Sequence, residues 1–156
     1  MIQVFQLFLL NPIGKKDYIR FRVSQQLMIK EIFLNSESRN SFIDVTGILA
    51  KHAEELNNGT IIVHIPHTTA GITINEGADP CVREDITNKL TRLIPREDNY
   101  KHDEGNSDAH IKSSIIGNTI TLIIDKGKII LGEWQRVFFC EFDGPRKRKI
   151  ILKMQH

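Results

Sequence analysis

Short strand-like runs and helical patterns follow one another irregularly along this chain, and their order constrains the fold more than any other feature. The helical patterns cover residues 45–56, the segment from Asp79 to Pro95, and residues 107–116. Runs rich in valine, isoleucine and phenylalanine predict short strands at 28–34, 41–45, 60–65, 119–124, 129–131, 134–142 and 149–154. Because strands and helices do not alternate one for one, we expect a single α+β domain with mixed, mostly antiparallel sheets and about three helices.

The helix after Asp79 has the clearest boundary signals. Asp79 can accept a hydrogen bond from a free first-turn amide, and Pro80 suits the first helical position. The apolar stripe of this helix is formed by Val82, Ile86, Leu90 and Leu93. In the third helix we expect Ile111 and Ile115 to face the core, with His110 and Ser114 on a neighbouring face.

The composition is that of an ordinary globular domain. With 156 residues, 40% of them hydrophobic and 26% charged, the chain can bury a core without disulfides or a structural metal. No apolar run approaches the roughly 18 residues of a membrane-spanning helix, so we expect no membrane segment. A net charge of +2 is too even to indicate nucleic-acid binding, and we expect none.

The N-terminus and the cysteines indicate the compartment. No Lys or Arg precedes the apolar run in residues 1–10, and no small-residue cleavage site follows it. Cys81 and Cys140 are too few for a disulfide framework, and both are expected as small core residues. These features predict a cytoplasmic protein.

Histidines mark the candidate site. His67 follows the strand at 60–65, while His102 and His110 bracket a polar segment that contains a glycine. Imidazole is a common metal ligand, and three histidines around a divalent ion with an open position form a catalytic geometry. We therefore expect His67, His102 and His110 to hold zinc or magnesium, with Glu76 nearby. A lone histidine inside a strand is usually a satisfied core or surface residue, so His64 is expected outside the site.

Hydroxyl groups and one arginine suggest that the ligand carries phosphate. Thr68 and Thr69 lead into Ala70-Gly71, where hydroxyls and successive amides could meet a phosphate. Arg146 opens a basic run near the C-terminus, and phosphate contact is one reading of it, a solvated strand face the other. Further candidates for substrate contact are Asn75, Trp134 and Gln135. Asp79 is assigned to the helix cap rather than to a metal.

Four blocks of sequence resemble the YjbQ family. They are His67-Thr-Thr-Ala-Gly-Ile-Thr-Ile-Asn-Glu-Gly-Ala-Asp-Pro80, His102-x-Glu-Gly-Asn-Ser-Asp-Ala-His110, Leu131-Gly-Glu-Trp-Gln135 and Glu141-Phe-Asp-Gly-Pro-Arg146. They occur in order and span most of residues 28–156. The resemblance implies a compact α+β domain that assembles as a homotrimer, with pockets near subunit boundaries lined by the matched histidines, Asn106, Glu76 and Arg146.

The resemblance also implies an activity, that of a secondary thiamine-phosphate synthase. His67, Glu76, Asn106, His110 and Arg146 are then the expected catalytic residues, acting on a small phosphorylated substrate. Two alternatives stay open on the residues alone. One is a zinc-dependent hydrolase of a small phosphorylated or acyl metabolite, and the other is a metabolite-binding protein without turnover.

The family domain is expected to begin near Met28. Residues 1–27 then form an N-terminal extension, and Met28 is a candidate start. Because these residues are basic and weakly patterned, we predict that they are dispensable for folding.

Overall fold

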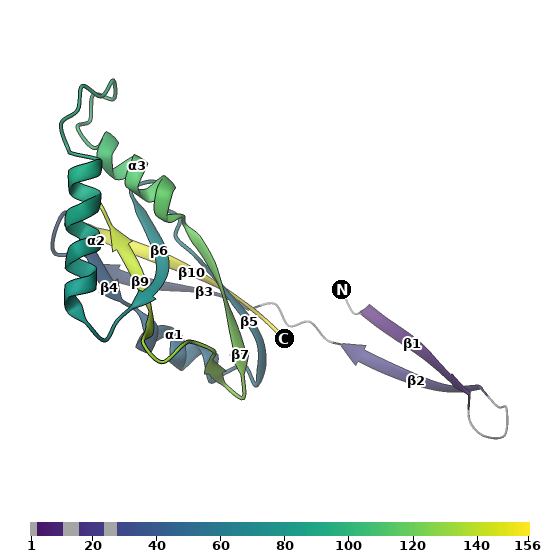
Figure 1. The fold of residues 1–156 in the computed structure, drawn as a ribbon. Coiled ribbons are helices and arrows are strands. Elements are labelled where there is room, and N and C mark those ends of the chain that lie inside the picture. The colour runs from purple at the N-terminus through teal and green to yellow at the C-terminus, as the bar shows by residue number, and fades with distance from the viewer. Residues whose placement is uncertain (1–2, 11–15, 24–27) are drawn as a thin grey trace.

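The computed structural model describes residues 3–10, 16–23 and 28–156 (Figure 1). Near the N-terminus, β1 (Gln3–Leu10) pairs antiparallel with β2 (Lys16–Val23) as a two-stranded sheet. This hairpin was not among the expected strands. The remaining described residues form three helices and two further sheets, which confirms the α+β expectation.

The larger sheet has five strands in the order β3-β10-β5-β7-β8, and the smaller has three in the order β4-β9-β6. All described pairings are antiparallel. The strands of the large sheet are β3 (Met28–Asn35), β10 (Lys147–Gln155), β5 (Asn58–His64), β7 (Thr119–Asp125) and β8 (Lys128–Ile129). Those of the small sheet are β4 (Ser41–Asp44), β9 (Gln135–Glu141) and β6 (Ala70–Glu76).

The main core lies between the inner faces of these two sheets and α1 (Thr46–Ala53) (Figure 1). Every second residue of β10 is buried there, which is the period expected when one face of a strand packs on a core. Central members of this core are Leu49, Ile61, Val63, Phe139, Ile150 and Leu152. A smaller cluster around Phe138 and Phe142 lies on the other face of the small sheet.

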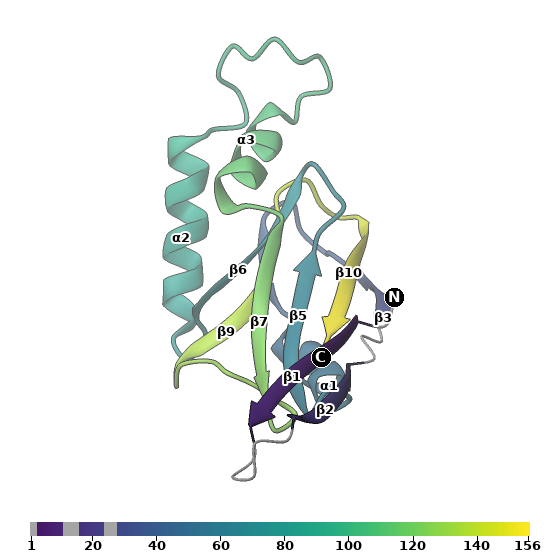
Figure 2. The same cartoon turned by 90° about the vertical axis from the view of Figure 1, so that its right-hand side faces the viewer.

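Two helices cover that other face. Both α2 (Pro80–Leu93) and α3 (Ser107–Ile116) lie beside the small sheet, and α3 packs on β6 (Figure 2). The start of α2 is as predicted, because the Asp79 carboxylate accepts a hydrogen bond from the Cys81 amide at 2.8 Å and Pro80 occupies the first turn.

The orientation predicted for α3 was wrong. Ile111 and Ile115 are 39% and 63% exposed, and the helix instead buries Ala109, Lys112 and Ser113. Burial of Lys112 is possible because its Nζ donates to Asp108 at 2.7 Å, and Ser113 donates to the Ala70 carbonyl. Apolar periodicity assigns the apolar side of a helix to the core, so it cannot predict a helix that buries its polar side.

One further expectation was wrong. Cys81 is exposed at the start of α2, whereas Cys140 is buried as expected. Strand β6 was not among the expected strands. In the described part of the chain, no helix is long and apolar enough to cross a membrane.

Candidate functional site

A pocket of about 470 Å³ opens where the β5–β6 connection faces α3. We call it the histidine pocket. It is lined by His64, Ile65, Pro66, His67, Thr68, His110, Ser113, Ser114, Gly117 and Asn118. The end of β5 supplies His64, the following turn supplies His67, and α3 supplies His110, so three elements bring these imidazoles to one cavity.

His67 is fixed as a neutral hydrogen-bond donor. Its Nε2 accepts a hydrogen bond from the backbone N–H of Lys149 at 2.8 Å. A neutral imidazole carries one proton, which must then lie on Nδ1. Burial, and after it the nearby Arg148 guanidinium, lower the pKa of His67 below its usual value of 6.5. At neutral pH this ring therefore offers an N–H group through Nδ1.

His64 also lines the pocket, and its Nδ1 is engaged within the protein. The Thr119 hydroxyl lies 2.8 Å from His64 Nδ1 and 3.1 Å from Asn118 Oδ1. When this hydroxyl donates its proton to Asn118, the contact with His64 is made by a proton on Nδ1. In that arrangement the Nε2 of His64 carries a lone pair, and it has no hydrogen-bond partner among the described residues. His67 can then donate a hydrogen bond to a ligand, and His64 can accept one.

His110 lies next to His102. Their ring centroids are 5.4 Å apart with an interplanar angle of 83°, an edge-to-face contact. His102 does not line the histidine pocket, and its Nε2 lies 3.6 Å from a Glu104 carboxylate oxygen. The structure thus brings His67 and His110 to one cavity and places His102 beside it.

A buried ion pair supports the turn that carries His67. Arg148 Nε donates to Glu141 at 2.7 Å, and its NH2 donates to both Glu141 and the Thr69 hydroxyl. Burial opposes ionisation of Glu141, but hydrogen bonds from Arg148, the Asp143 amide and Ser36 outweigh it and hold the pKa of Glu141 below 4.5. The Thr69 hydroxyl is therefore engaged within the protein, whereas Thr68 lines the pocket.

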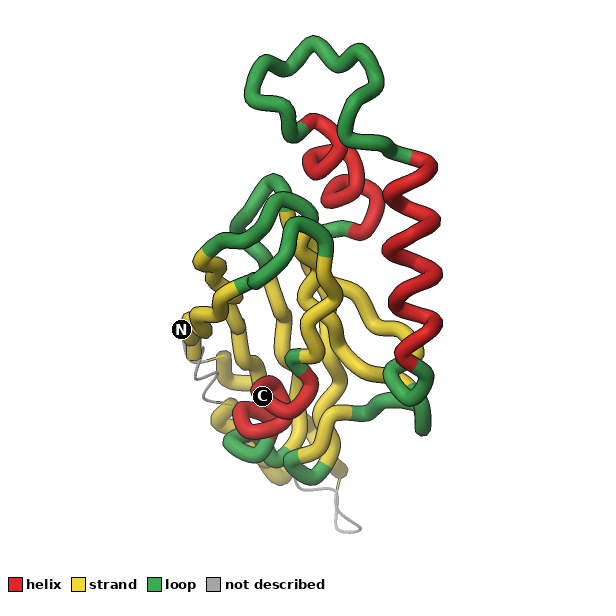
Figure 3. The backbone as a smooth tube through the Cα atoms, turned by 90° about the vertical axis from the view of Figure 1, so that its left-hand side faces the viewer, coloured by secondary structure: helices red, strands yellow, loops and turns green. Residues whose placement is uncertain are grey.

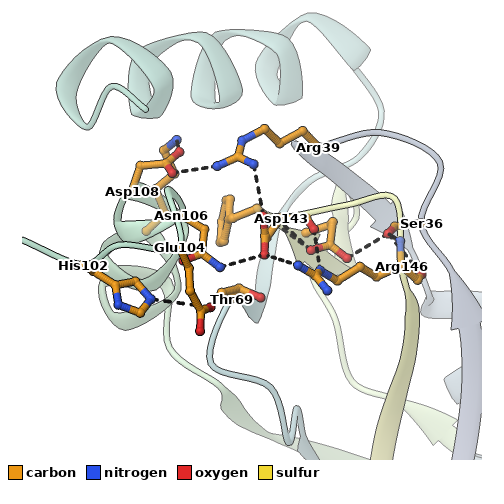
Figure 4. A network of polar contacts seen from close by, with 12 residues as sticks. Ser36, Arg39, Thr69, His102, Glu104, Asn106, Asp108, Asp143 and Arg146 are labelled. Atoms are coloured by element: carbon orange, nitrogen blue, oxygen red, sulfur yellow. Dashed lines mark hydrogen bonds and ion pairs between the residues drawn. The ribbon is translucent and has the colours of Figure 1, made fainter. Parts of the chain in front are cut away.

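Asn106 and Arg146 belong to a second polar network (Figure 4). Both contact Asp143, with Asn106 Nδ2 at 3.1 Å and Arg146 NH2 at 2.7 Å from Oδ2. Burial opposes ionisation of Asp143, but these two hydrogen bonds and the nearby Arg39 hold its pKa below 3.8. Arg39 also bonds Asp108, which joins this network to α3. About half of the Arg146 side chain remains exposed.

The other expected site residues lie at the far end of β6. Asn75 and Glu76 line a different pocket together with Trp134 and Gln135. Glu76 lies six positions after Ala70 along extended strand, a span of about 20 Å. Within one chain these four residues do not meet the histidines. Trp134 is 62% exposed, so it is not a core residue.

No three His, Cys, Asp or Glu side chains among the described residues are grouped closely enough to hold a metal ion. The donor set of one chain therefore does not fit a metal held by His67, His102 and His110 together. A physical reason is visible at His67, because a metal on Nδ1 would place the proton on Nε2, which already accepts the Lys149 amide.

Sequence reasoning missed His64 as a site residue. Its position inside an apolar run suggested an ordinary strand residue, and the usable signal was that it is the last residue before the β5–β6 turn. Ser113 and Asn118 were also missed, because Ser113 lies on the buried side of α3 and Asn118 follows that helix. Ser114 was expected beside His110 but was not assigned to the site.

A family model and the sequences of known proteins place this chain in one family. The family model described as UPF0047 protein YjbQ-like matches residues 30–156. A UPF0047 protein of Methanocaldococcus jannaschii is 48% identical over 133 residues, which cover 82% of this chain and 96% of that protein. UPF0047 protein YugU of Bacillus subtilis is 42% identical over 130 residues, which cover 81% of this chain and 98% of YugU.

Solved structures of proteins from the same family have a similar fold. An uncharacterized conserved protein of the YjbQ/UPF0047 family from Clostridium acetobutylicum superposes with a TM-score of 0.78 and 47% identity, covering 80% of this chain and 98% of that one. A YbjQ-like protein of unknown function from Sulfolobus solfataricus gives a TM-score of 0.80 at 26% identity, covering 85% and 99%.

Proposed function

Because this chain belongs to the UPF0047 YjbQ-like family, we propose that it is an enzyme that transforms a small phosphorylated metabolite in the histidine pocket. The reaction proposed is thiamine-phosphate synthesis, as a weak or secondary activity. The observation that carries an enzymatic role is that one cavity holds the Nδ1 donor of His67 and the unpartnered Nε2 of His64.

Two imidazoles that present opposite hydrogen-bonding roles suit general acid–base catalysis. A donor stabilises negative charge that develops on a leaving group, and an acceptor removes a proton or orients an N–H or O–H group. A pocket of about 470 Å³ also has the size usual for small-molecule sites, for which roughly 300–1,000 Å³ is typical.

The proposed reaction joins a pyrimidine carried as a diphosphate ester to a thiazole phosphate. The carbon–oxygen bond of the pyrimidine methylene breaks, its electron pair leaves with pyrophosphate, and the thiazole nitrogen lone pair forms the new carbon–nitrogen bond. His67 Nδ1–H donates to the departing oxygen, and His64 Nε2 accepts a hydrogen bond from the amino group of the pyrimidine. Thr68, which lines the histidine pocket, contacts phosphate oxygens. Arg146 is about half exposed but does not line the pocket, and it is the proposed second contact to phosphate.

A divalent ion would neutralise pyrophosphate in this reaction. Because the described residues of one chain do not form a three-ligand site, we derive no step through it. The same observation weighs against the alternative of a hydrolase built on a histidine-bound zinc ion.

We also propose that the protein acts as a homotrimer. The outer face of the large sheet exposes Ile29 and Phe33 of β3 and Ile123 of β7 by 69%, 73% and 61%, and these apolar side chains are available for contact with another copy. Assembly would bring Glu76 and Trp134 of one copy toward the histidine pocket of the next. Sedimentation velocity tests this, and a monomer at micromolar concentration would contradict it.

The experiment that tests the function uses purified full-length protein with hydroxymethylpyrimidine diphosphate, thiazole phosphate and magnesium, and measures thiamine phosphate as fluorescent thiochrome phosphate. We expect turnover in the wild type and a fall of about 100-fold or more in His64→Asn and His67→Gln. The new asparagine amide keeps a donor toward Thr119, and the new glutamine amide keeps an acceptor toward Lys149, so both variants should fold.

His52→Gln is the matched control, because His52 lies on α1 outside the pocket and should retain full activity. Equal rates in the three variants would contradict the proposed roles. Product-free binding of either substrate, seen as a shift in melting temperature, would favour a binding protein instead.

A further inference from the structure

A second cavity adjoins the histidine pocket. It has a volume of about 430 Å³ and is lined by Tyr100, Lys101, His102, Ser107, His110 and Ile111. We call it the Tyr100 pocket. The loop that supplies Tyr100 and His102 connects α2 to α3 and extends beyond both helices (Figure 3).

The two pockets lie end to end along one face of α3. Ser107, His110 and Ile111 line the Tyr100 pocket, while His110, Ser114 and Gly117 line the histidine pocket. Residues spaced by three and four share one face of a helix, so these positions form a continuous stripe. From Ser107 to Gly117 the stripe is about 15 Å long. His110 belongs to both pockets and lies between them.

The lining of the Tyr100 pocket suits a flat, aromatic ligand. Tyr100 is held in place by a hydrogen bond from its hydroxyl to the Pro95 carbonyl at 2.9 Å. His102 is oriented by its edge-to-face contact with His110, and Ile111 adds an apolar side chain that is 39% exposed. Aromatic and aliphatic surfaces held in fixed positions bind a ring through stacking and burial.

Charge specifies the ligand further. Lys101 forms no ion pair with any described residue, whereas His102 faces Glu104 at 3.6 Å. Lys101 is therefore the cation of this pocket that remains available to a ligand. A ring with an anionic substituent would satisfy both the apolar lining and the free ammonium group.

We propose that the Tyr100 pocket is a second subsite, which binds an aromatic heterocycle carrying a phosphate and holds it across His110 from the reactant in the histidine pocket. This inference rests on the proposed function, because a transfer between two molecules needs two adjoining sites. It assigns Tyr100 and Lys101 to substrate binding. Among the described residues, His110 is the one that lines both pockets.

The test measures binding of phenyl phosphate, a minimal aromatic phosphate, to the full-length protein by calorimetry, with inorganic phosphate as the reference ligand. We expect phenyl phosphate to bind at least about tenfold more tightly than inorganic phosphate, since the phenyl ring removes apolar surface from water when it is buried. Lys101→Gln and Tyr100→Leu should each raise its Kd at least about fivefold, and Lys89→Gln, an exposed lysine of α2 outside both pockets, should leave it unchanged.

Equal binding of the two ligands, or an unchanged Kd in Lys101→Gln, would overturn the subsite. Lys101 is exposed, so that variant folds even if Tyr100→Leu does not. The outcome is separable from that of the proposed function. If Lys101→Gln weakens the binding of phenyl phosphate but the wild type shows no turnover, the subsite stands and the proposed activity is wrong. If the wild type shows turnover and Lys101→Gln binds phenyl phosphate normally, the proposed activity stands and the subsite is wrong.

Discussion

Arg148 and Glu141 form an ion pair in the interior, with Arg148 Nε 2.7 Å and NH2 2.5 Å from the two carboxylate oxygens. The side chains are 6% and 0% exposed. This pair links β10 to β9 and, through the Thr69 hydroxyl, to the turn that carries His67. The position of a pocket residue therefore depends on a buried pair of charges on two strands.

Breaking this pair should be strongly destabilising. Arg148→Met leaves the Glu141 carboxylate buried without its partner, so the free energy of unfolding should fall by about 3–5 kcal/mol. Lys128→Met, an exposed change on β8, should alter it by less than about 0.5 kcal/mol. Urea unfolding measures both. The double variant Glu141→Gln/Arg148→Met should recover part of the loss, and a single variant as stable as the wild type would refute the argument.

Stability should depend on pH through His67. Its pKa is lowered in the folded protein, whereas the unfolded imidazole titrates near 6.5. Between these two values the unfolded state binds more protons, so the contribution of His67 is fully present above pH 6.5 and is lost as the pH falls toward the folded pKa. Between pH 7.5 and pH 5.5, the free energy of unfolding measured in urea should fall more for the wild type than for His67→Gln. An equal fall in both proteins would contradict the lowered pKa of His67.

The two cysteines should react differently with Ellman's reagent. Cys140 is buried, and burial raises the pKa of its thiol, so it should react only when the protein unfolds. Cys81 is exposed, but a hydrogen bond to Asp79 and the charge of that carboxylate raise the pKa of its thiol. Asp79→Asn keeps a residue that caps helices well and removes the charge, so Cys81 should react faster at pH 8. A slower reaction would show that the carboxylate does not control the thiol.

Gly71 should not tolerate a side chain. A Cβ atom there would lie 2.6 Å from the carbonyl oxygen of Gly117, which accepts the Ile72 amide at the end of α3. Gly71→Ala should therefore destabilise the domain by about 1–3 kcal/mol. Gly47→Ala is the control, because a Cβ in that α1 position meets no atom within 4 Å and alanine favours helix, so stability should be unchanged or higher. Thermal unfolding compares the two.

Residues 1–27 should be dispensable for folding. The family model matches from residue 30, and the core members whose side chains the structure describes lie between Met28 and Met154. A chain that starts at Met28 should keep its melting temperature within a few degrees and its oligomeric state, as measured by calorimetry and sedimentation. A truncated chain that fails to fold, or that changes its assembly, would refute this prediction.

Local signals in the sequence were sufficient to predict the fold class and most element positions. Apolar periodicity placed β3, β5, β7 and β10, and Asp79-Pro80 placed the start of α2 to the residue, because these signals act over a few neighbouring positions. The sequence also pointed to His67 and His110, since histidines at the ends of elements meet along one edge of a sheet.

Contacts between distant segments, in contrast, set which groups meet and which nitrogen of each imidazole carries a proton. The tautomer of His67 depends on the Lys149 amide, 82 residues away in sequence, and Lys112 is buried only because Asp108 and Arg39 share its network. The separation of Glu76 from the histidines follows from the length of β6. Long-range pairing and the solvation of charged groups govern these features, and neither leaves a local pattern in the sequence.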